Sequence, residues 1–538
     1  MSIRSFGLIA EEKTGTFCRK IKKSVLESEA WSQAGKLRPY QWGIIGLCLI
    51  ICYGVKIFTY SFGIDTESFA FRYDAAMIEF VQSGRYSIFF FKKVFGIKPF
   101  VPQFSIALWI VSFAVYGIIG GLFASLFTKR KSGWYTVLFS ALLFSHPVFA
   151  EQFYFTHQAF EITLGMIGSL ISAYLACFWC EQYKKTWAFV LSLLIAVVSF
   201  GCYQAVPALY IAEFFCYMYG FLSADRISNK WKFLLRAGAI MLLSAILYFG
   251  TDKIAHLLIH AENSYVGGMF GWKLSDPMPT IRMIAANLRM VITAQGPFYN
   301  LFYPVIAAVF LVLNLIALIR GKEERGAHGW KLFTAAVIAF SPFFLMIFTG
   351  HAMIVRTQFV LPFVCAYMGV VSIDMVSTEL EGVKKLAGRI LLIALATAAV
   401  FIQSQTINRL WNTAYITYQN DLLFANNLIH TIEEATGESL VHTDKKILFT
   451  GRYVPHKAAN TLVGETIGKS FFEYDNHLEY MGSTYRIVGF YENIGYELWS
   501  ASLEQAIEGQ AIARTMPAYP KEGCVRVQDN LIIVKLSE

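Results

Sequence analysis

The stretch WGIIGLCLIICYGVKIFTYSFGIDTES, residues 42–68, contains an apolar run long enough to cross a membrane and ends in an acidic pair. Asp65 and Glu67 stand just outside that run, ahead of an amphipathic stretch that begins near Tyr73. An ionisable group is costly to keep at a membrane face and by default indicates a functional site. The stretch therefore predicts a membrane fold together with an acid–base or cation site at the bilayer surface.

The rest of the chain has the composition of a polytopic membrane protein. Of its 538 residues, 56% are hydrophobic and only 15% are charged, and the mean hydropathy is +0.49. Such a composition places most of the chain in lipid rather than around a water-facing core. Spans of roughly 20 apolar residues are expected at about eleven places. Their centres lie near Cys48, Tyr116, Phe139, Gly168, Leu194, Phe214, Leu242, Phe310, Ile338, Tyr367 and Ala396.

Lys and Arg residues cluster in alternate loops between these spans. The clusters lie in the leader, residues 1–39, and at residues 129–131, 184–185, 226–232, 320–325 and 384–389. Because such residues stay on the cytoplasmic side, the leader is expected inside the cell. It lacks the features of a cleaved signal peptide and is expected to remain. The net charge of +9 is then a topology signal, and no motif indicates a nucleic-acid partner.

Three regions follow from this pattern. A basic cytoplasmic leader, residues 1–39, precedes a transmembrane domain, residues 40–404, whose long first outer loop covers residues 61–104. Residues 405–538 then form a small extracytoplasmic α/β domain. The predicted fold is thus a polytopic α-helical membrane protein with a small C-terminal α/β domain. In that domain we expect helices at 420–436 and 503–514, and strands at 445–452, 485–491 and 525–536, the last interrupted by a turn at 528–530.

Two interpretations of the acidic pair remain open. Asp65 can cap the helix expected after it, with Glu67 in the first turn, where the helix dipole favours a carboxylate. Alternatively, two carboxylates two residues apart in an extended segment point the same way, toward whatever occupies the membrane face. The amphipathic stretch that follows, with Asp74 on its polar side, is expected to lie on the bilayer surface.

Residues with the spacing of a metal site are not evident. The pair Cys177 and Cys180 has C-x-x-C spacing but ends a hydrophobic span and has no second ligand pair. We also find no Gly-rich phosphate loop and no D-x-D motif of the kind that binds nucleotide sugars. No metal and no cofactor are therefore expected.

Four short segments carry a resemblance to a known family. They are 64–67 (Ile-Asp-Thr-Glu), 84–86 (Gly-Arg-Tyr), 153–158 with His157, and 516–520 leading to 533–536. Together with the long first outer loop and the many spans, they resemble the GT-C superfamily of membrane glycosyltransferases. Within it, the chain is most similar to the bacterial O-antigen glucosyltransferases of the serotype-conversion type.

The resemblance implies an inverting glycosyltransferase of the bacterial cytoplasmic membrane. It would move glucose or another hexose from a polyprenyl-phosphate donor to a cell-surface polysaccharide or a lipid-linked glycan on the outer face. In such enzymes an acidic residue of the first outer loop is the general base, and Asp65 matches it, with Glu67 as its supporting neighbour. General base catalysis typically contributes about 10²- to 10⁴-fold in rate.

The donor phosphate needs cations, preferably Arg. Candidates on the outer side are Arg72, Arg85, Arg282, Arg289 and Arg356, and Asp74 and His157 are counted as further substrate-binding residues. Arg356 begins a span, where a charge without a partner is expensive, although it could instead snorkel to the interface. His157 and Glu161 lie four residues apart and could form a mutually satisfied pair.

Two other classes of protein remain possible from the sequence. In a flippase of polyprenyl-linked sugars the carboxylates would carry protons or bind sugar, although such folds often show internal repeats. In a membrane acyltransferase His157 or His351 would be the base. In every case membrane lipid is an expected partner.

Overall fold

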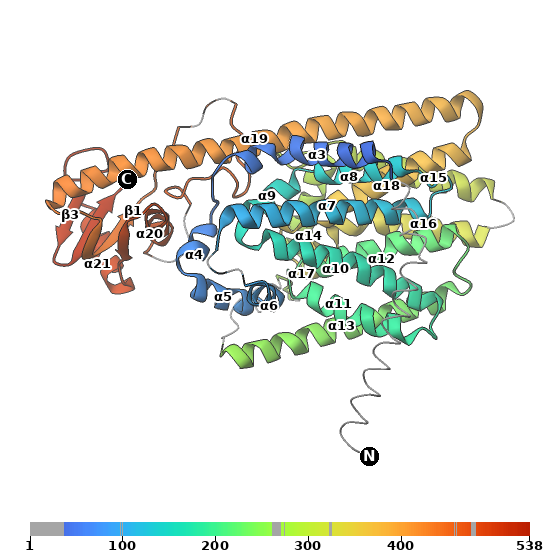
Figure 1. Cartoon of the computed structure of the whole chain (residues 1–538), viewed down its shortest axis with the longest axis horizontal. Coiled ribbons are helices and arrows are strands. Elements are labelled where there is room, and N and C mark those ends of the chain that lie inside the picture. The colour runs from blue at the N-terminus through green and yellow to red at the C-terminus, as the bar shows by residue number, and fades with distance from the viewer. Residues whose placement is uncertain are drawn as a thin grey trace, which may run out of the picture.

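The computed structural model describes residues 37–96, 98, 100–260, 271–273, 275–321, 325–456, 458, 460–474 and 480–538. All but the last three residues of the predicted leader lie outside the described residues. The described part is a bundle of long helices with a small four-stranded sheet at one end, and we call this end of the molecule the sheet end (Figure 1).

Apolar helices, most of them long, form the bundle. They are α3 (Pro39–Phe58), α7 (Pro102–Leu126), α8 (Gly133–Phe144), α9 (Val148–Tyr154), α10 (Thr156–Glu181), α11 (Thr186–Phe200), α12 (Val206–Ser223), α13 (Lys230–Ile259), α15 (Phe302–Arg320), α16 (Arg325–Phe340), α17 (Phe344–Thr349), α18 (Val360–Glu379) and α19 (Gly382–Thr436). A further helix, α14 (Met278–Ile292), follows α13, and the short turns η2 (Ser341–Phe343) and η3 (Val355–Thr357) flank α17.

The predicted membrane fold is confirmed in its main feature. Within the described residues, nine helices are long and apolar enough to cross a membrane. The pair α8 and α9 would make a tenth, bent by 63° at a break that contains Pro147, which cannot continue a helix ladder. Helix α11 has 15 residues and is shorter than a full span. All eleven predicted centres lie in one of these helices, while the number that cross a bilayer stays a prediction.

The loop predicted at residues 61–104 contains three short helices. They are α4 (Thr66–Phe71), α5 (Tyr73–Gln82) and α6 (Tyr86–Val94), and they lie at the sheet end of the bundle (Figure 1). The amphipathic character expected of α5 is present, because Met77 and Phe80 are buried while Asp74 is exposed. This loop therefore packs against the bundle through its apolar side chains.

Helix α19 links the bundle to the sheet without a break. It has 55 residues and ends at Gly437, whose φ of 69° gives the left-handed conformation that commonly ends a helix. The boundary predicted between residues 404 and 405 falls inside this helix. The last span and the predicted helix 420–436 are thus one element.

The sheet has the strand order β2-β1-β4-β3. The strands are β1 (His442–Thr450), β2 (Glu497–Ser500), β3 (Val525–Gln528) and β4 (Leu531–Lys535). Strand β1 runs parallel to β2 and β4, and β3 and β4 form an antiparallel hairpin. The hairpin turns at the predicted place, and the predicted helix at 503–514 is α21 (Leu503–Ala513).

One predicted strand is wrong. Residues 485–491 belong to a helix, α20 (Thr484–Asn493), and β2 was not predicted at all. The run is rich in aromatic and β-branched residues, which favour strands. As a helix it nevertheless buries Ile487, Phe490 and Tyr491, so that tertiary packing outweighs local preference.

The segment 451–474 fastens the C-terminal part to the bundle. The buried carboxylate of Glu151, on α9, accepts hydrogen bonds from the backbone N–H groups of Glu465 (3.1 Å) and Thr466 (2.5 Å), and another from Ile467 (3.3 Å). On α19, Asp421 accepts hydrogen bonds from Ser470 and Phe471. Both carboxylates hold this segment over the end of the bundle.

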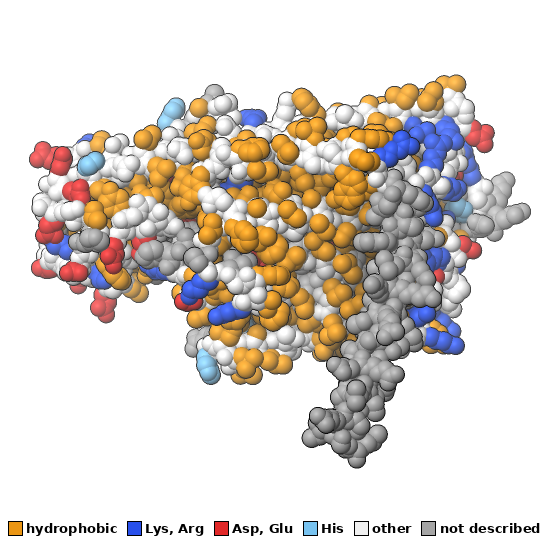
Figure 2. Space-filling model, in the orientation of Figure 1, with side chains coloured by type: hydrophobic (Ala, Val, Ile, Leu, Met, Phe, Trp, Pro, Cys, Tyr) orange, Lys and Arg blue, Asp and Glu red, His pale blue; other side chains and the backbone are white. Residues whose placement is uncertain are grey.

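Charge is distributed unevenly along the molecule. Figure 2 shows Lys and Arg side chains gathered at the end away from the sheet, and Asp and Glu side chains spread over the sheet end. The loops between α7 and α8 and between α10 and α11, which contain residues 129–131 and 184–185, join helices at the former end (Figure 1). Residues 384–389 belong to the first turns of α19.

Candidate functional site

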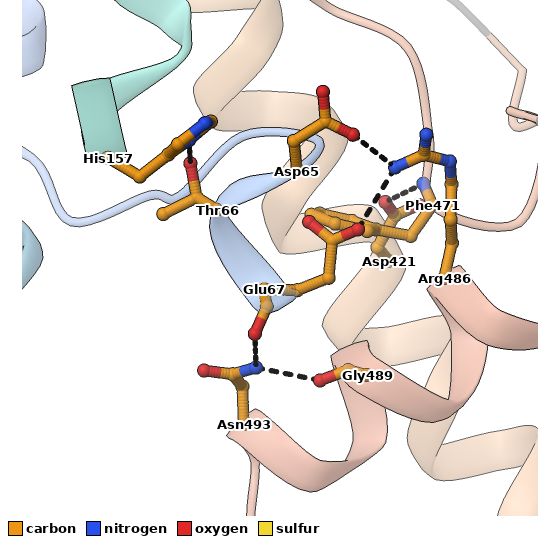
Figure 3. Close-up of polar contacts among 9 residues, drawn as sticks. All are labelled: Asp65, Thr66, Glu67, His157, Asp421, Phe471, Arg486, Gly489 and Asn493. Atoms are coloured by element: carbon orange, nitrogen blue, oxygen red, sulfur yellow. Dashed lines mark hydrogen bonds and ion pairs between the residues drawn. The ribbon is translucent and has the colours of Figure 1, made fainter. Parts of the chain in front are cut away.

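The two predicted catalytic carboxylates meet at one arginine. Nη1 of Arg486 lies 2.9 Å from Oδ1 of Asp65 and 3.0 Å from Oε1 of Glu67 (Figure 3). Asp65 precedes α4, Glu67 lies in its first turn, and Arg486 comes from α20. The acidic pair therefore has a cationic partner 421 positions away in the chain.

Asp65 occupies the N-cap position of α4 but does not act as the cap. Its φ of 70° is in the left-handed region, which is unusual and strained for a residue other than glycine. In the part of the chain that the structure describes, its side chain makes no capping hydrogen bond and turns to Arg486 instead. The segment is also not extended, in contrast to one of the two interpretations of the sequence, because α4 begins at Thr66. The carboxylates converge because a helix begins between them.

The carboxylates differ in exposure and in charge state. The Glu67 side chain is 1% exposed, whereas 47% of the Asp65 side chain is accessible. Burial raises the pKa of Glu67 to about 8 in spite of Arg486, and the charge of Asp65 adds to the rise. Burial also raises the pKa of Asp65, but Arg486, His157 and Arg356 outweigh it and hold that pKa below its ordinary value. At neutral pH Asp65 is therefore ionised, while Glu67 carries a proton.

His157 lies beside this pair without contacting Glu161. Its Nδ1 is 3.4 Å from Oγ1 of Thr66, and its ring stacks on Phe69 with a centroid distance of 5.0 Å. Glu161 instead forms a buried ion pair with Lys92 at 2.8 Å. The pairing considered for His157 and Glu161 is wrong, because each has a partner from the loop helices.

Arg356 faces the same site from η3. Its guanidinium lies 4.8 Å from the centroid of the Phe155 ring. Burial lowers its pKa, but Tyr203, Asp65 and Glu465 outweigh burial and raise that pKa above its ordinary value. Glu465 also accepts a hydrogen bond from the backbone N–H of Val355 at 3.0 Å. Arg356 thus has acidic neighbours in space that are absent from its neighbourhood in sequence.

Arg85 is held by neutral partners. Its Nε donates to Gln204 (3.1 Å), its Nη1 donates to Gln158 (2.9 Å), and its guanidinium lies 4.6 Å from the centroid of the Tyr203 ring. Arg85 and Arg356 both interact electrostatically with His157. Both cations therefore lie near His157.

The other predicted binding residues have different surroundings. Arg72 lies over the ring of Tyr485 at 6.0 Å. Asp74 forms an ion pair with Lys98 at 2.8 Å, and both side chains are largely exposed. Arg282 is exposed on α14.

Arg486, Glu465 and Lys92 were not predicted as site residues. Their one signal in the sequence is a charge inside or beside an apolar run, which for Arg486 is the predicted strand 485–491. Among the described residues, no three His, Cys, Asp or Glu side chains are grouped so that they could hold a metal ion.

A search of curated proteins gives no significant match to this chain. A family model described as Glucosyl transferase GtrII matches residues 53–373, which is more than half of the chain, and confirms the predicted resemblance. The matched range contains Asp65, Glu67, His157 and Arg356, and it ends before Arg486. The chain belongs to the GtrII family of glucosyltransferases.

Proposed function

We propose that this glucosyltransferase moves glucose from a polyprenyl-phosphate donor to a glycan acceptor, with inversion and with Asp65 as the general base. One observation carries the proposal, namely an ionised and accessible carboxylate, Asp65, held beside Arg486 and facing Arg356. A base must reach the hydroxyl that it deprotonates, and of the two carboxylates Asp65 is the accessible one.

The reaction is a single displacement. The acceptor oxygen forms a bond to the anomeric carbon of glucose while the bond from that carbon to the donor phosphate breaks. The acceptor proton passes to Asp65, and the polyprenyl phosphate leaves with the bonding electrons. The negative charge of Asp65 also favours the oxocarbenium-like character of such a transition state.

The leaving phosphate would be bound by Arg356 and Arg85. A monophosphate brings one or two negative charges, and each charge-assisted hydrogen bond contributes roughly 1.5 to 3 kcal/mol. Arg85 donates to the neutral amides of Gln158 and Gln204. Its charge is therefore not neutralised by these two partners and can favour an anion.

We place the sheet end on the outer face of the bacterial cytoplasmic membrane. The gathering of Lys and Arg at the opposite end of the molecule supports this orientation (Figure 2). The acceptor is then a surface polysaccharide such as O-antigen, or a lipid-linked glycan, since these are the glycans present on that face.

Reconstitution with labelled donors tests the proposal. Purified protein in lipid vesicles should transfer labelled glucose from polyprenyl-phosphate glucose to an acceptor glycan, and mass spectrometry should find one added hexose. UDP-glucose should give no transfer, and EDTA should leave the rate unchanged. Transfer from UDP-glucose would overturn the assignment of the donor. Movement of the lipid-linked sugar across the vesicle membrane without transfer, or transfer of an acyl group, would instead identify a flippase or an acyltransferase.

A further inference from the structure

We infer that Arg486 is the positioning residue of this site, which holds the carboxylate of Asp65 in place as the base. The inference rests on the proposed function. It means that a residue beyond the matched range, in the C-terminal α/β part of the chain, completes the active site.

The contact itself is enclosed and specific. A single nitrogen, Nη1 of Arg486, reaches both Asp65 and Glu67 (Figure 3). The arginine side chain is 14% exposed, and its guanidinium lies 4.8 Å from the centroid of the Tyr474 ring. Among the described residues, its Nε is buried without a hydrogen-bond partner. An arginine in such a place stays charged, so that it is a permanent cation beside the pair.

Helix α20 presents one face to α4. Arg486, Gly489 and Asn493 are spaced three and four residues apart, which puts them on the same side of the helix. Nδ2 of Asn493 donates to the backbone carbonyl of Glu67 at 3.2 Å. A Cβ atom at Gly489 would lie 3.1 Å from Cγ of Glu67, so this position allows close approach. Three successive contacts thus fix where Arg486 sits.

The charges around Asp65 come from several elements. They are Glu67 on α4, Glu79 on α5, Arg356 at η3 and Arg486 on α20. His157 on α10 also faces Asp65, but burial disfavours its protonated form, so it is neutral at neutral pH. Of the two arginines, Arg486 makes the direct 2.9 Å contact with Asp65. Removing its charge should therefore make Asp65 harder to ionise and leave Glu67 protonated.

A merely structural role predicts a different outcome. If Arg486 only ties α20 to α4, its loss would lower stability and leave the pH dependence of the remaining activity unchanged. If Arg486 positions an ionised base, its loss moves the acidic limb of that dependence. The pH profile therefore separates the two roles.

The test measures kcat/KM for polyprenyl-phosphate glucose against pH in Arg486→Gln, Arg486→Met and Arg486→Lys, with Arg514→Ala, an exposed substitution directly after α21, as control. Both neutral variants should move the acidic limb upward by about 1 to 3 pH units, the usual effect of an arginine on a neighbouring aspartate. In Arg486→Lys the acidic limb should lie close to its wild-type pH, and Arg514→Ala should have the wild-type pH profile. Arg486→Met keeps an apolar chain over Tyr474 and carries the test if the glutamine variant fails to fold.

An unmoved limb in a folded neutral variant would overturn the inference, and so would a lysine variant that shifts as far as the neutral ones. Asp65→Asn separates this failure from failure of the proposed function. If Asp65→Asn keeps wild-type turnover, Asp65 is not the base. If Asp65→Asn is inactive while the Arg486 variants have wild-type pH profiles, the result contradicts the role inferred for Arg486 and leaves the proposed function standing.

Discussion

Asp65 and Glu67 are chemically similar side chains that the fold places in different charge states. The side chain of Glu67, in the first turn of α4, is enclosed against α20. Its Oε2 is buried without a hydrogen-bond partner among the described residues. Asp65 is accessible and lies near the cations Arg486 and Arg356. Two neighbouring carboxyls with separated pKa values are typical of sites where one group must be ionised and the other neutral.

Replacing Glu67 should flatten the pH dependence of stability. The pKa of Glu67 is about 8 in the folded protein, above the ordinary value of roughly 4.3 in an unfolded chain. The folded state therefore binds this proton more tightly, and the stability that results is fully present below the unfolded pKa and is lost as the pH rises toward 8. The wild-type melting temperature should fall across this window.

In Glu67→Gln that fall should be smaller, as measured by thermal unfolding in detergent from about pH 5 to 8. Glu504→Gln, an exposed substitution in the first turn of α21, should behave as the wild type does. An equal fall in Glu67→Gln and the wild type would show that Glu67 does not carry the proton.

Replacing Arg356 should weaken donor binding. Loss of one charge-assisted hydrogen bond of roughly 1.5 to 3 kcal/mol raises the donor KM about 10- to 100-fold. Arg356→Ala should show this rise with an unchanged fold by circular dichroism. Arg356→Lys should recover part of the affinity, and the exposed Arg526→Ala should have the wild-type KM. A wild-type KM in Arg356→Ala would mean that other groups hold the phosphate.

At the scale of elements, the segment 451–474 connects the helix bundle to the C-terminal part of the chain and contributes residues next to the candidate site. It supplies Glu465 near Arg356 and Tyr474 beneath Arg486. The carboxylate of Glu151 accepts hydrogen bonds from the backbone of this segment. Gly464 makes room for that carboxylate, because a Cβ atom at this position would clash with it.

Glu151→Ala should therefore loosen this segment. The backbone N–H groups of Glu465, Thr466 and Ile467 would lose their acceptor, and a buried donor left unsatisfied costs about 1 to 3 kcal/mol. We expect a lower melting temperature and faster tryptic cleavage within residues 451–474. The exposed Glu434→Ala in α19 is the matched control. Wild-type stability and cleavage in Glu151→Ala would contradict the role given to this carboxylate.

The elements were largely predictable because spans and amphipathic helices carry strong periodic or apolar signals. The strand β2 was missed, and α20 has the composition of a strand, so that its helical form depends on packing against α4 and the sheet. Asp65 was predictable as a site residue because its signal, a carboxylate next to a span, is local. Arg486 was not, because its partner lies 421 positions away and nothing in its own segment indicates the pairing.

At the scale of the whole molecule, the proposed orientation places the site outside the cell. Single cysteines introduced at exposed positions test it with a membrane-impermeant maleimide. Asp74→Cys, at the sheet end, should react in intact cells, and Lys184→Cys, between α10 and α11, should react only after permeabilisation. The opposite pattern would reverse the topology and place the acidic pair in the cytoplasm.

Three regions of the chain meet at the candidate site. The bundle supplies His157 and Arg356, the first loop supplies Asp65, and the C-terminal part supplies Arg486.

The most direct measurement of this account compares donor binding and turnover in Asp65→Asn. The variant keeps the size of the side chain and removes the base, so it should bind polyprenyl-phosphate glucose with nearly the wild-type affinity and turn over at about 1% of the wild-type rate or less. Asp276→Asn, an exposed substitution ahead of α14, should have the wild-type affinity and rate. Wild-type turnover in Asp65→Asn would contradict the assignment of Asp65 as the base.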